Sequence, residues 1–176
     1  MLKRHPSNPL IKPEMLKPSH PAYRVKGAFN AGAVEWNKET ILLLRVAEDC
    51  IPKEGYAAVP YYSFKDGEGT PEILEVALDD PDVKLKDTRG VVYKGVDYLS
   101  TMSHIRLARS SDGINFKVDD KPFIYPCVES ECFGCEDARA TVIEGKVYLN
   151  YTAISGDGWV TALATTDDFK TIDRKG

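Results

Sequence analysis

Glycine and proline interrupt this chain so often that no long helix fits into it. Thirteen glycines and eleven prolines are spread along 176 residues. Residues 72–86 come nearest to an amphipathic helix, and Pro71 and Pro81 cut that pattern short. Between the interruptions lie short runs rich in Val, Ile, Leu, Tyr and Thr, which favour strands. The sequence therefore predicts an all-β fold.

Glu144-Gly145 separates two runs of alternating apolar and polar residues, which predicts a tight two-residue hairpin. Small polar residues mark further turns at 37–38, 65–67, 111–113 and 156–158. We expect strands at residues 28–36, 40–47, 57–64, 72–77, 90–95, 97–109, 121–125, 138–143, 146–153 and 159–165.

A weak internal repeat suggests how these strands are organised. Residues 96–101 lead into 107–116 much as residues 147–152 lead into 163–169, with offsets of 50 at the tyrosines and 56 at the alanines. Residues 33–44 form a fainter third copy of the first half. A repeat near 50 residues made of strands is typical of propeller blades, although β-hairpins in general look alike at this level.

Two to three blades fit into this chain, whereas a closed propeller needs at least four. We therefore expect residues 1–176 to form a partial β-propeller domain, the first half of a longer one or a unit that pairs with another chain. A half propeller would leave sheet faces uncovered and tend to self-associate, so a homo-oligomer is expected.

Charge and hydropathy exclude several classes of partner. Lysine and arginine number 23 against 27 aspartates and glutamates, a net charge of −4, so a basic nucleic-acid binder is not expected. The longest aliphatic run is Ile41–Leu44, far short of a membrane span. The basic residues at 3–4 are not followed by an apolar run, so we expect no secretory signal and a cytoplasmic location.

Three cysteines, Cys127, Cys132 and Cys135, have the C-x4-C-x2-C spacing of plant-type [2Fe–2S] sites. Such a site needs a fourth ligand, and the remaining cysteine, Cys50, lies 77 residues upstream. Three small, partly buried loop thiols are the simpler interpretation, and we expect no metal.

Two adjacent carboxylates, Glu136 and Asp137, precede Arg139 at the entry to a predicted strand. In an extended segment they point to opposite faces, so Arg139 can hold one while the other faces a cavity. A carboxyl group in a partly dry cleft can act as a general acid. A surface salt-bridge cluster would have the same composition.

Other polar residues interrupt apolar strands and are candidate ligand-binding groups. Asn30 and Arg45 need partners if buried, which a hydroxyl-rich ligand or an internal Asn–Arg hydrogen bond would supply. His104 and Arg106 share one face of their predicted strand, where a structural role is the alternative. Arg174 lies near the chain end, where a solvated tail is the alternative.

Taken together, these segments resemble glycoside hydrolase family 130, the β-mannoside phosphorylases and related β-mannosidases. The resemblance is carried by Phe29-Asn30-Ala31-Gly32-Ala33, by residues 42–46 and 98–110, by Gly134-Cys135-Glu136-Asp137-Ala138-Arg139 and by residues 162–169, in this order along nearly the whole chain. It implies a five-bladed β-propeller with its active site on the central axis, of which this chain covers about half.

The resemblance also implies roles for individual residues. Asp137 would be the catalytic acid, oriented by Glu136 and Arg139. Asn30 and Arg45 would contact the mannosyl unit at the cleaved end. His104 and Arg106 are expected to bind substrate as well, and Arg174 is expected to bind phosphate.

The implied reaction is inverting phosphorolysis of a β-mannobioside or short oligosaccharide to α-mannose 1-phosphate. A phosphorylase needs one acid and cationic groups for the phosphate, whereas an inverting hydrolase usually needs a second carboxylate. Inorganic phosphate would be a co-substrate, and no other cofactor is expected. The alternatives are a phosphate-independent β-mannosidase of the same family, a catalytically silent sugar-binding remnant and an iron–sulfur protein.

Overall fold

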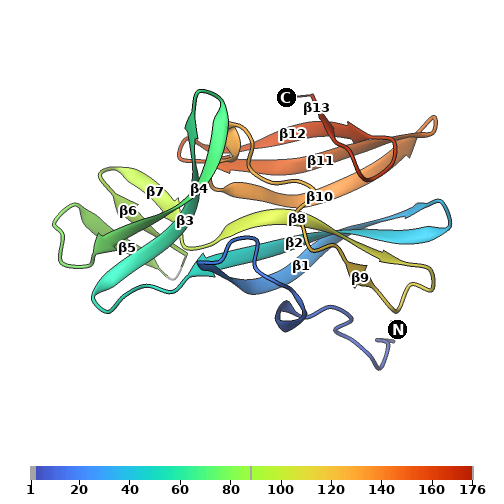
Figure 1. The fold of residues 1–176 in the computed structure, drawn as a ribbon, viewed down its shortest axis with the longest axis horizontal. Helices are drawn as coiled ribbons and strands as arrows, with labels where there is room; N and C mark the ends of the chain where they lie inside the picture. The colour runs from blue at the N-terminus through green and yellow to red at the C-terminus, as the bar shows by residue number, and fades with distance from the viewer. Residues whose placement is uncertain (1–2, 88, 176) are drawn as a thin grey trace.

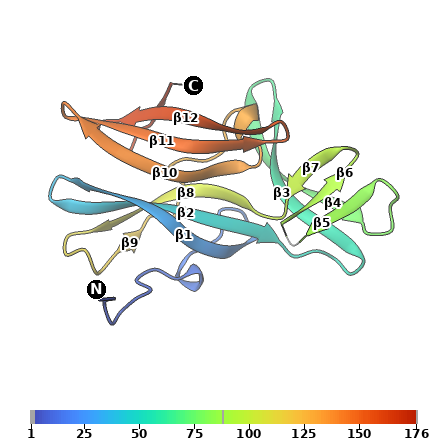
Figure 2. The ribbon, with the colours of Figure 1, turned by 180° about the vertical axis from the view of Figure 1, so that it is seen from behind.

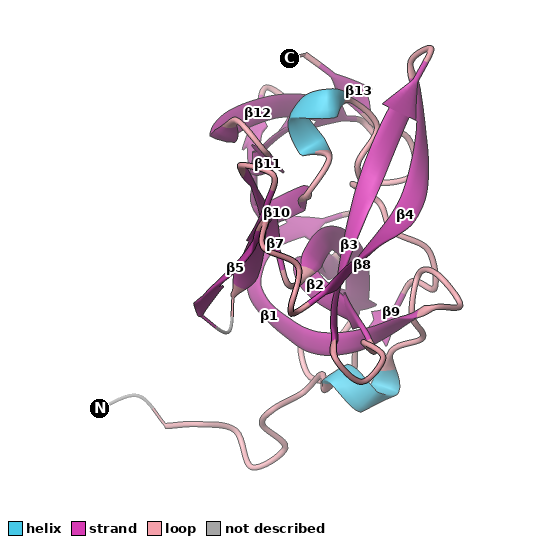
Figure 3. Ribbon diagram, turned by 90° about the vertical axis from the view of Figure 1, so that its left-hand side faces the viewer, coloured by secondary structure: helices cyan, strands magenta, loops and turns pink. Residues whose placement is uncertain are grey.

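The computed structural model describes residues 3–87 and 89–175. Nearly all regular structure in these residues is strand, as predicted, and Figure 3 shows two single-turn 3-10 helices beside the strands. The helices are η1 (Pro13–Met15) and η2 (Glu129–Glu131). No helix within the described residues is long and apolar enough to cross a membrane.

Two four-stranded units, which we call blades, form the largest sheet (Figure 1). Strands within each blade pair antiparallel, and the blades are joined by one parallel pair, Gly134 with Ser103. The first blade contains β1 (Tyr23–Trp36), β2 (Glu39–Cys50), β8 (Met102–Ser110) and β9 (Lys117–Val118). The second contains β10 (Gly134–Ile143), β11 (Lys146–Ser155), β12 (Gly158–Thr166) and β13 (Asp173–Arg174).

A long insertion separates β2 from β8 and forms two small sheets at one end of the blades (Figure 2). The first sheet is a hairpin of β3 (Tyr56–Lys65) and β4 (Glu68–Ala77). The second contains β5 (Val83–Asp87), β6 (Gly90–Tyr93) and β7 (Val96–Leu99). The Tyr62 amide donates to the Cys132 carbonyl at 2.8 Å and ties the insertion to the loop before β10.

The second half of the predicted repeat, the turns after residues 110 and 166, is confirmed. Ser110 accepts the amides of Asp112 and Gly113, and Asp112 accepts those of the two residues that follow Gly113. Thr166 and Asp168 make the same set of bonds 56 residues later. These hydroxyl and carboxylate caps replace backbone partners in the turns, as side chains of this kind do.

The first half of the repeat is wrong. Residues 96–101 do not belong to a blade, because β7 lies in the inserted sheet and Ser100-Thr101 separates it from β8. The hairpin β1–β2 is the counterpart of β10–β11. The fainter copy over residues 33–44 is therefore the segment that corresponds to residues of the second blade. The described chain therefore contains two blades, the lower of the two numbers expected.

Several strand limits differ from those predicted. Residues 121–125 form no strand and touch the sheet through one bridge, Ile105 with Ile124. The short strands β5, β9 and β13 were not predicted, because they are mostly polar and two of them contain only two residues each. The hairpin turn at Glu144-Gly145 is confirmed, with φ values of 50° and 78°.

The main core lies between the two blades. It joins apolar side chains of β2 and β8 to those of β10, β11 and β12, including Leu43, Ile105, Leu107, Leu149 and Ala164. The other face of the first blade is covered by the segment before β1, where the Ser19 amide donates to the buried Glu48 carboxylate at 2.7 Å.

Candidate functional site

Each blade places one Asn or Asp at a bulge in its first strand. Asn30 in β1 and Asp137 in β10 have φ values of 50° and 53°, and the register with the neighbouring strand shifts at each. Among residues with a side chain, Asn and Asp adopt this left-handed conformation with least strain. The bulges turn both side chains out of the regular alternation of the strand.

The two bulges lie directly against each other. A Cβ on Gly32 would stand 2.3 Å from the Ala138 carbonyl oxygen, so no larger residue fits there without moving one strand. Arg139 spans the gap, because its Nη1 donates to the carbonyls of Asn30 at 3.0 Å and of Ala138 at 2.9 Å. Arg139 therefore braces the backbone on both sides of the site.

The Asp137 carboxylate receives hydrogen bonds from two strands of the other blade, β1 and β2. The Asn30 amide donates to its two oxygens at 3.2 and 3.3 Å, and Arg45 Nη1 lies 3.2 Å from Oδ1. The Asp137 side chain nevertheless keeps 38% of its surface exposed. It is held in place and remains accessible to a ligand.

Glu136 has a different environment. Its carboxylate is paired with Arg45 Nη2 and accepts a hydrogen bond from the Ser103 hydroxyl at 3.1 Å. Arg45 Nε in turn donates to the Ser103 oxygen at 3.1 Å. Burial raises the pKa of Glu136, while the Arg45 charge and the Ser103 hydrogen bond oppose that rise.

The two neighbouring carboxylates are therefore not equivalent. Glu136 lies largely buried with its charge compensated, whereas Asp137 faces outward beside an amide and a guanidinium. The arrangement presents one accessible carboxylate with fixed hydrogen-bond donors around it, which suits proton transfer to a hydroxyl-rich ligand. Arg45 also lies over the Phe29 ring at 4.9 Å, which restricts its position.

Five of the predicted site residues thus come together: Asn30, Arg45, Glu136, Asp137 and Arg139. Ser103 completes the group, although the sequence analysis gave it no role. A serine in an otherwise apolar strand beside His104 was the available signal, but nothing local showed that it would meet Arg45 and Glu136.

His104 and Arg106 are not part of this group. Both are buried on the face of β8 that carries Glu48 of β2, whereas Ser103 points to the other face. Arg106 Nε donates to His104 Nε2 at 3.0 Å, and His104 Nδ1 lies 3.7 Å from Glu48. The structure therefore does not bring these two residues together with Asp137. Their predicted position on one shared face of the strand is confirmed.

Arg174 reaches a separate buried cluster. Its Nη1 pairs with Glu131 and donates to the Tyr151 hydroxyl at 2.9 Å, while Nη2 donates to the Tyr125 carbonyl at 2.8 Å. The Tyr151 hydroxyl donates to Glu131 at 2.7 Å. The charge of Arg174 is compensated within the chain, and the residue is not a solvated tail.

The cysteines do not assemble a ligand set. Across residues 3–87 and 89–175, no three Cys, His, Asp or Glu side chains lie close enough to hold a metal ion. Cys135 is buried in the main core, and burial raises its pKa well above the ordinary value. The C-x4-C-x2-C spacing therefore marks loop and core thiols in this structure.

Four-stranded blades with a polar cluster between them define a protein of the β-propeller class. The model of one protein family, described as beta-1,4-mannooligosaccharide phosphorylase, matches residues 81–176, more than half of the chain. The chain belongs to glycoside hydrolase family 130, whose members fold as five-bladed propellers.

Individual relatives agree with this assignment. The beta-1,2-mannobiose phosphorylase of Listeria innocua is 42% identical over 178 residues, covering 98% of this chain and 50% of the relative. A beta-1,2-mannobiose phosphorylase of Thermoanaerobacter sp. is 39% identical over 72 residues, covering 39% of this chain and 24% of the relative.

Solved structures show the same fold. The Listeria innocua enzyme in complex with beta-1,2-mannobiose superposes with a TM-score of 0.88 at 41% identity, covering 98% of this chain and 50% of that one. A glycosyl hydrolase from Bacteroides ovatus superposes with a TM-score of 0.62 at 22% identity, over 97% of this chain and 39% of that one. The chain spans about half the length of the Listeria innocua relative.

Proposed function

We propose that this chain carries the acid and sugar-binding half of an inverting β-mannoside phosphorylase. In this proposal Asp137 is the catalytic acid for release of α-mannose 1-phosphate from a β-mannobioside or short β-manno-oligosaccharide. The observation that carries it is the accessible Asp137 carboxylate, held between Asn30 and Arg45 of the other blade. The phosphorylases among the relatives support the reaction type.

The supply of carboxylates favours phosphorolysis over hydrolysis. An inverting hydrolase uses a second carboxylate to activate water. Glu136, the nearest candidate, has its Oε1 atom bound by both Arg45 and Ser103, so its charge is already compensated. A phosphate nucleophile is already anionic and needs only cationic partners.

Two arginines could supply the positive charge. The family resemblance assigns phosphate to Arg174, whose guanidinium would share its charge between Glu131 and the phosphate. Arg139 binds only backbone carbonyls through Nη1, and no carboxylate pairs with it among the described residues. Arg174 is therefore the proposed phosphate-binding residue, and Arg139 is the second arginine against which its effect on phosphate dependence is compared.

The test is to incubate the chain with β-1,2- and β-1,4-mannobiosides, with and without inorganic phosphate, and to assay mannose 1-phosphate and mannose. We expect mannose 1-phosphate only when phosphate is present. Asp137→Asn should abolish it while leaving sugar binding, since the amide keeps the shape and loses the proton. Mannose at equal rates in both tubes would favour the β-mannosidase, and no product would favour a silent sugar-binding chain.

The phosphate residue is tested by the phosphate dependence of the rate. Arg174→Lys should raise the phosphate concentration for half-maximal rate more than Arg139→Lys does. The reason is that a lysine ammonium cannot make the bidentate contact with phosphate that an arginine guanidinium makes. The reverse order would transfer the phosphate site to Arg139.

A further inference from the structure

The loop before β10 and the inserted sheets enclose a second pocket that the Asp137 site does not use. It has a volume of about 370 Å³ and lies between the β3–β7 insertion, η2 and the turn from β11 to β12. A pocket of this size is large enough for a small ligand. Its residues come from three segments far apart in the sequence.

One wall of the pocket is aromatic. Tyr61 and Tyr98 lie with ring centroids 5.9 Å apart, and Tyr98 lies 5.3 Å from Phe133. Tyr61 and Tyr98 are only partly buried, so part of each ring is open to a ligand. The electron-rich face of an aromatic ring attracts the weakly positive C–H groups of a sugar ring.

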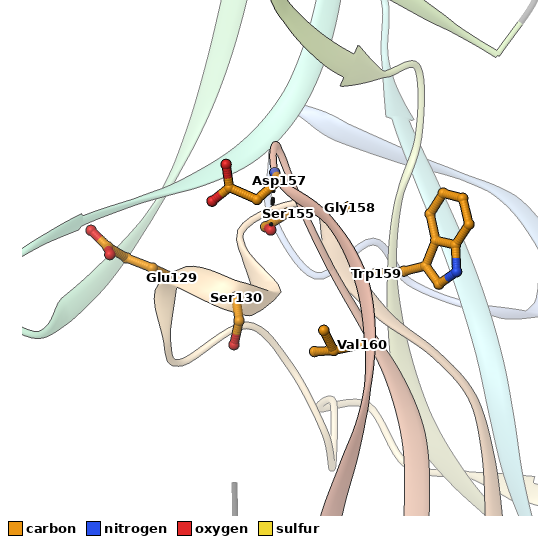
Figure 4. A pocket seen from close by; sticks show the side chains of 7 residues that line it. All are labelled: Glu129, Ser130, Ser155, Asp157, Gly158, Trp159 and Val160. Atoms are coloured by element: carbon orange, nitrogen blue, oxygen red, sulfur yellow. Dashed lines mark hydrogen bonds between the residues drawn. The ribbon is translucent and has the colours of Figure 1, made fainter.

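Two carboxylates also line the pocket without a partner among the described residues. Glu129 and Asp157 both line the pocket, and within the described chain neither carboxylate makes a hydrogen bond or ion pair. Ser155 also lines the pocket, and its hydroxyl accepts the Asp157 amide at 3.3 Å. Figure 4 shows a neighbouring pocket that shares Glu129, Ser155 and Asp157 with this one, and in it the Glu129 and Asp157 side chains lie away from Trp159.

The combination indicates the class of ligand. No lysine or arginine lines the pocket, which disfavours phosphate and other anions. Free carboxylates disfavour a purely apolar ligand, because they would lose water without gaining a partner. A carboxylate accepts two hydroxyl groups at once, and an aromatic wall covers an apolar ring face, so the pocket matches a neutral sugar.

The pocket also lies close to the Asp137 site along the chain. Phe133 precedes Glu136 by three residues, which is roughly 10 Å of extended strand. A short oligosaccharide can span this distance, with one end at Asp137 and its outer units in the pocket.

We propose that this pocket is an outlying binding site for further sugar units of a β-manno-oligosaccharide. The proposal rests on the proposed function for the identity of the sugar, and it makes the chain select oligosaccharides longer than two units. Aromatic stacking on Tyr61 and Tyr98 and hydroxyl bonds to Glu129 and Asp157 would supply the affinity.

Direct binding tests this without any need for turnover. We would titrate Asp137→Asn with β-1,2-mannobiose, -triose and -tetraose in the absence of phosphate and follow backbone NMR shifts. The tetraose should bind about tenfold more tightly than the biose and perturb residues 98, 133 and 157 as well as 30 and 137. A gain of this size corresponds to one or two net hydrogen bonds.

Variants separate the pocket from the site. Glu129→Gln with Asp157→Asn should remove most of the gain for the tetraose and leave biose binding unchanged. The matched control is Glu144→Gln with Asp167→Asn, two exposed carboxylates in turns away from the pocket. Tyr98→Leu should act like the first pair, with its melting temperature measured to show that the fold is kept.

Several results would overturn the proposal. Equal affinity for biose and tetraose would do so, as would shifts confined to residues around Asp137. A tetramethylammonium ion that binds the pocket while the tetraose does not would assign it to cations instead. If the pocket variants lose tetraose binding but phosphate never yields mannose 1-phosphate, the pocket stands and the proposed reaction fails.

Discussion

At the scale of single residues, the site depends on a hydroxyl group that bridges two charges. Ser103 is fully buried and connects Arg45 to Glu136. Ser103→Ala should lower the free energy of unfolding by about 2 kcal/mol, because both charged groups lose a buried hydrogen bond. Chemical denaturation measures this, with the exposed Ser111→Ala as a control expected to change little.

The pH dependence of that loss identifies its cause. Without the hydroxyl, the pKa of Glu136 should rise further, since the hydrogen bond from Ser103 opposes the effect of burial. The destabilisation should therefore grow as the pH rises through the range in which Glu136 ionises, because the Ser103 hydroxyl stabilises the ionised carboxylate. A loss independent of pH would mean that Ser103 only fills space.

His104 should remain neutral well below the usual range for histidine. Burial, with a smaller contribution from the Arg106 charge, lowers its pKa to about 3. The imidazole of the unfolded chain binds a proton near pH 6.5. His104 therefore lowers the free energy of unfolding as the pH falls from about 6.5 to 3. Glu48 faces His104, and burial raises the pKa of the Glu48 carboxyl. Protonation of Glu48 therefore raises the free energy of unfolding as the pH falls, opposite to the effect of His104.

The measurement for His104 must therefore be specific to the residue. Its imidazole NMR signals should stay constant between pH 7 and pH 4.5. A titration midpoint near pH 6 would contradict the buried position.

At the scale of strands, the contact between the two bulges holds the site together. Gly32→Ala should destabilise the chain by about 2–3 kcal/mol, because the new methyl group would overlap the Ala138 carbonyl. It should also separate Asn30 from Asp137 and weaken mannobiose binding. Thermal unfolding and calorimetric titration measure both effects, and the exposed Ala33→Ser on the same strand is the control. Unchanged sugar binding would show that the bulges move independently.

The sequence predicted the long hairpins well and their arrangement less well. Alternation of apolar residues and turn residues located β1–β4 and β10–β12, since those signals are local. The insertion of β3–β7 was missed, because its strands show the same alternation as a blade. The bulge at Asp137 was also missed, since the left-handed backbone depends on the contact with Gly32.

The grouping of site residues followed from the resemblance and not from residue patterns. Asn30, Arg45 and Asp137 lie up to 107 positions apart, and their contacts arise only when the two blades pack. His104 and Arg106 were proposed as binding residues because they interrupt an apolar strand and share one face of it. Successive residues of a strand point to opposite faces, so His104 and Arg106 lie on the face away from the Ser103 side chain.

At the scale of the whole molecule, the two blades have unequal outer faces. The outer face of the first is covered by the segment before β1, while the second exposes Ile143, Trp159 and Leu163. The pairing of β10, β11 and β12 places these three on one face. An exposed apolar face of this kind favours association.

We therefore expect the 176-residue chain to self-associate. Trp159→Arg with Leu163→Glu should shift sedimentation toward the monomer, because both charges would lie in the contact. Ile51→Glu, an exposed apolar position outside this face, should have no such effect. A chain that is already monomeric and cooperatively folded at high concentration would contradict the expectation of a half propeller.

The two facing bulges have a consequence for how such a protein can originate. If one blade was copied from the other, the ancestral pair had the same residue at positions 30 and 137, as the shared backbone conformation still permits. Asparagine and aspartate differ only by an amide nitrogen in place of an oxygen. A single base change in the codon is enough for that exchange, so one mutational step converts a symmetric pair of amides into an amide facing a carboxylate.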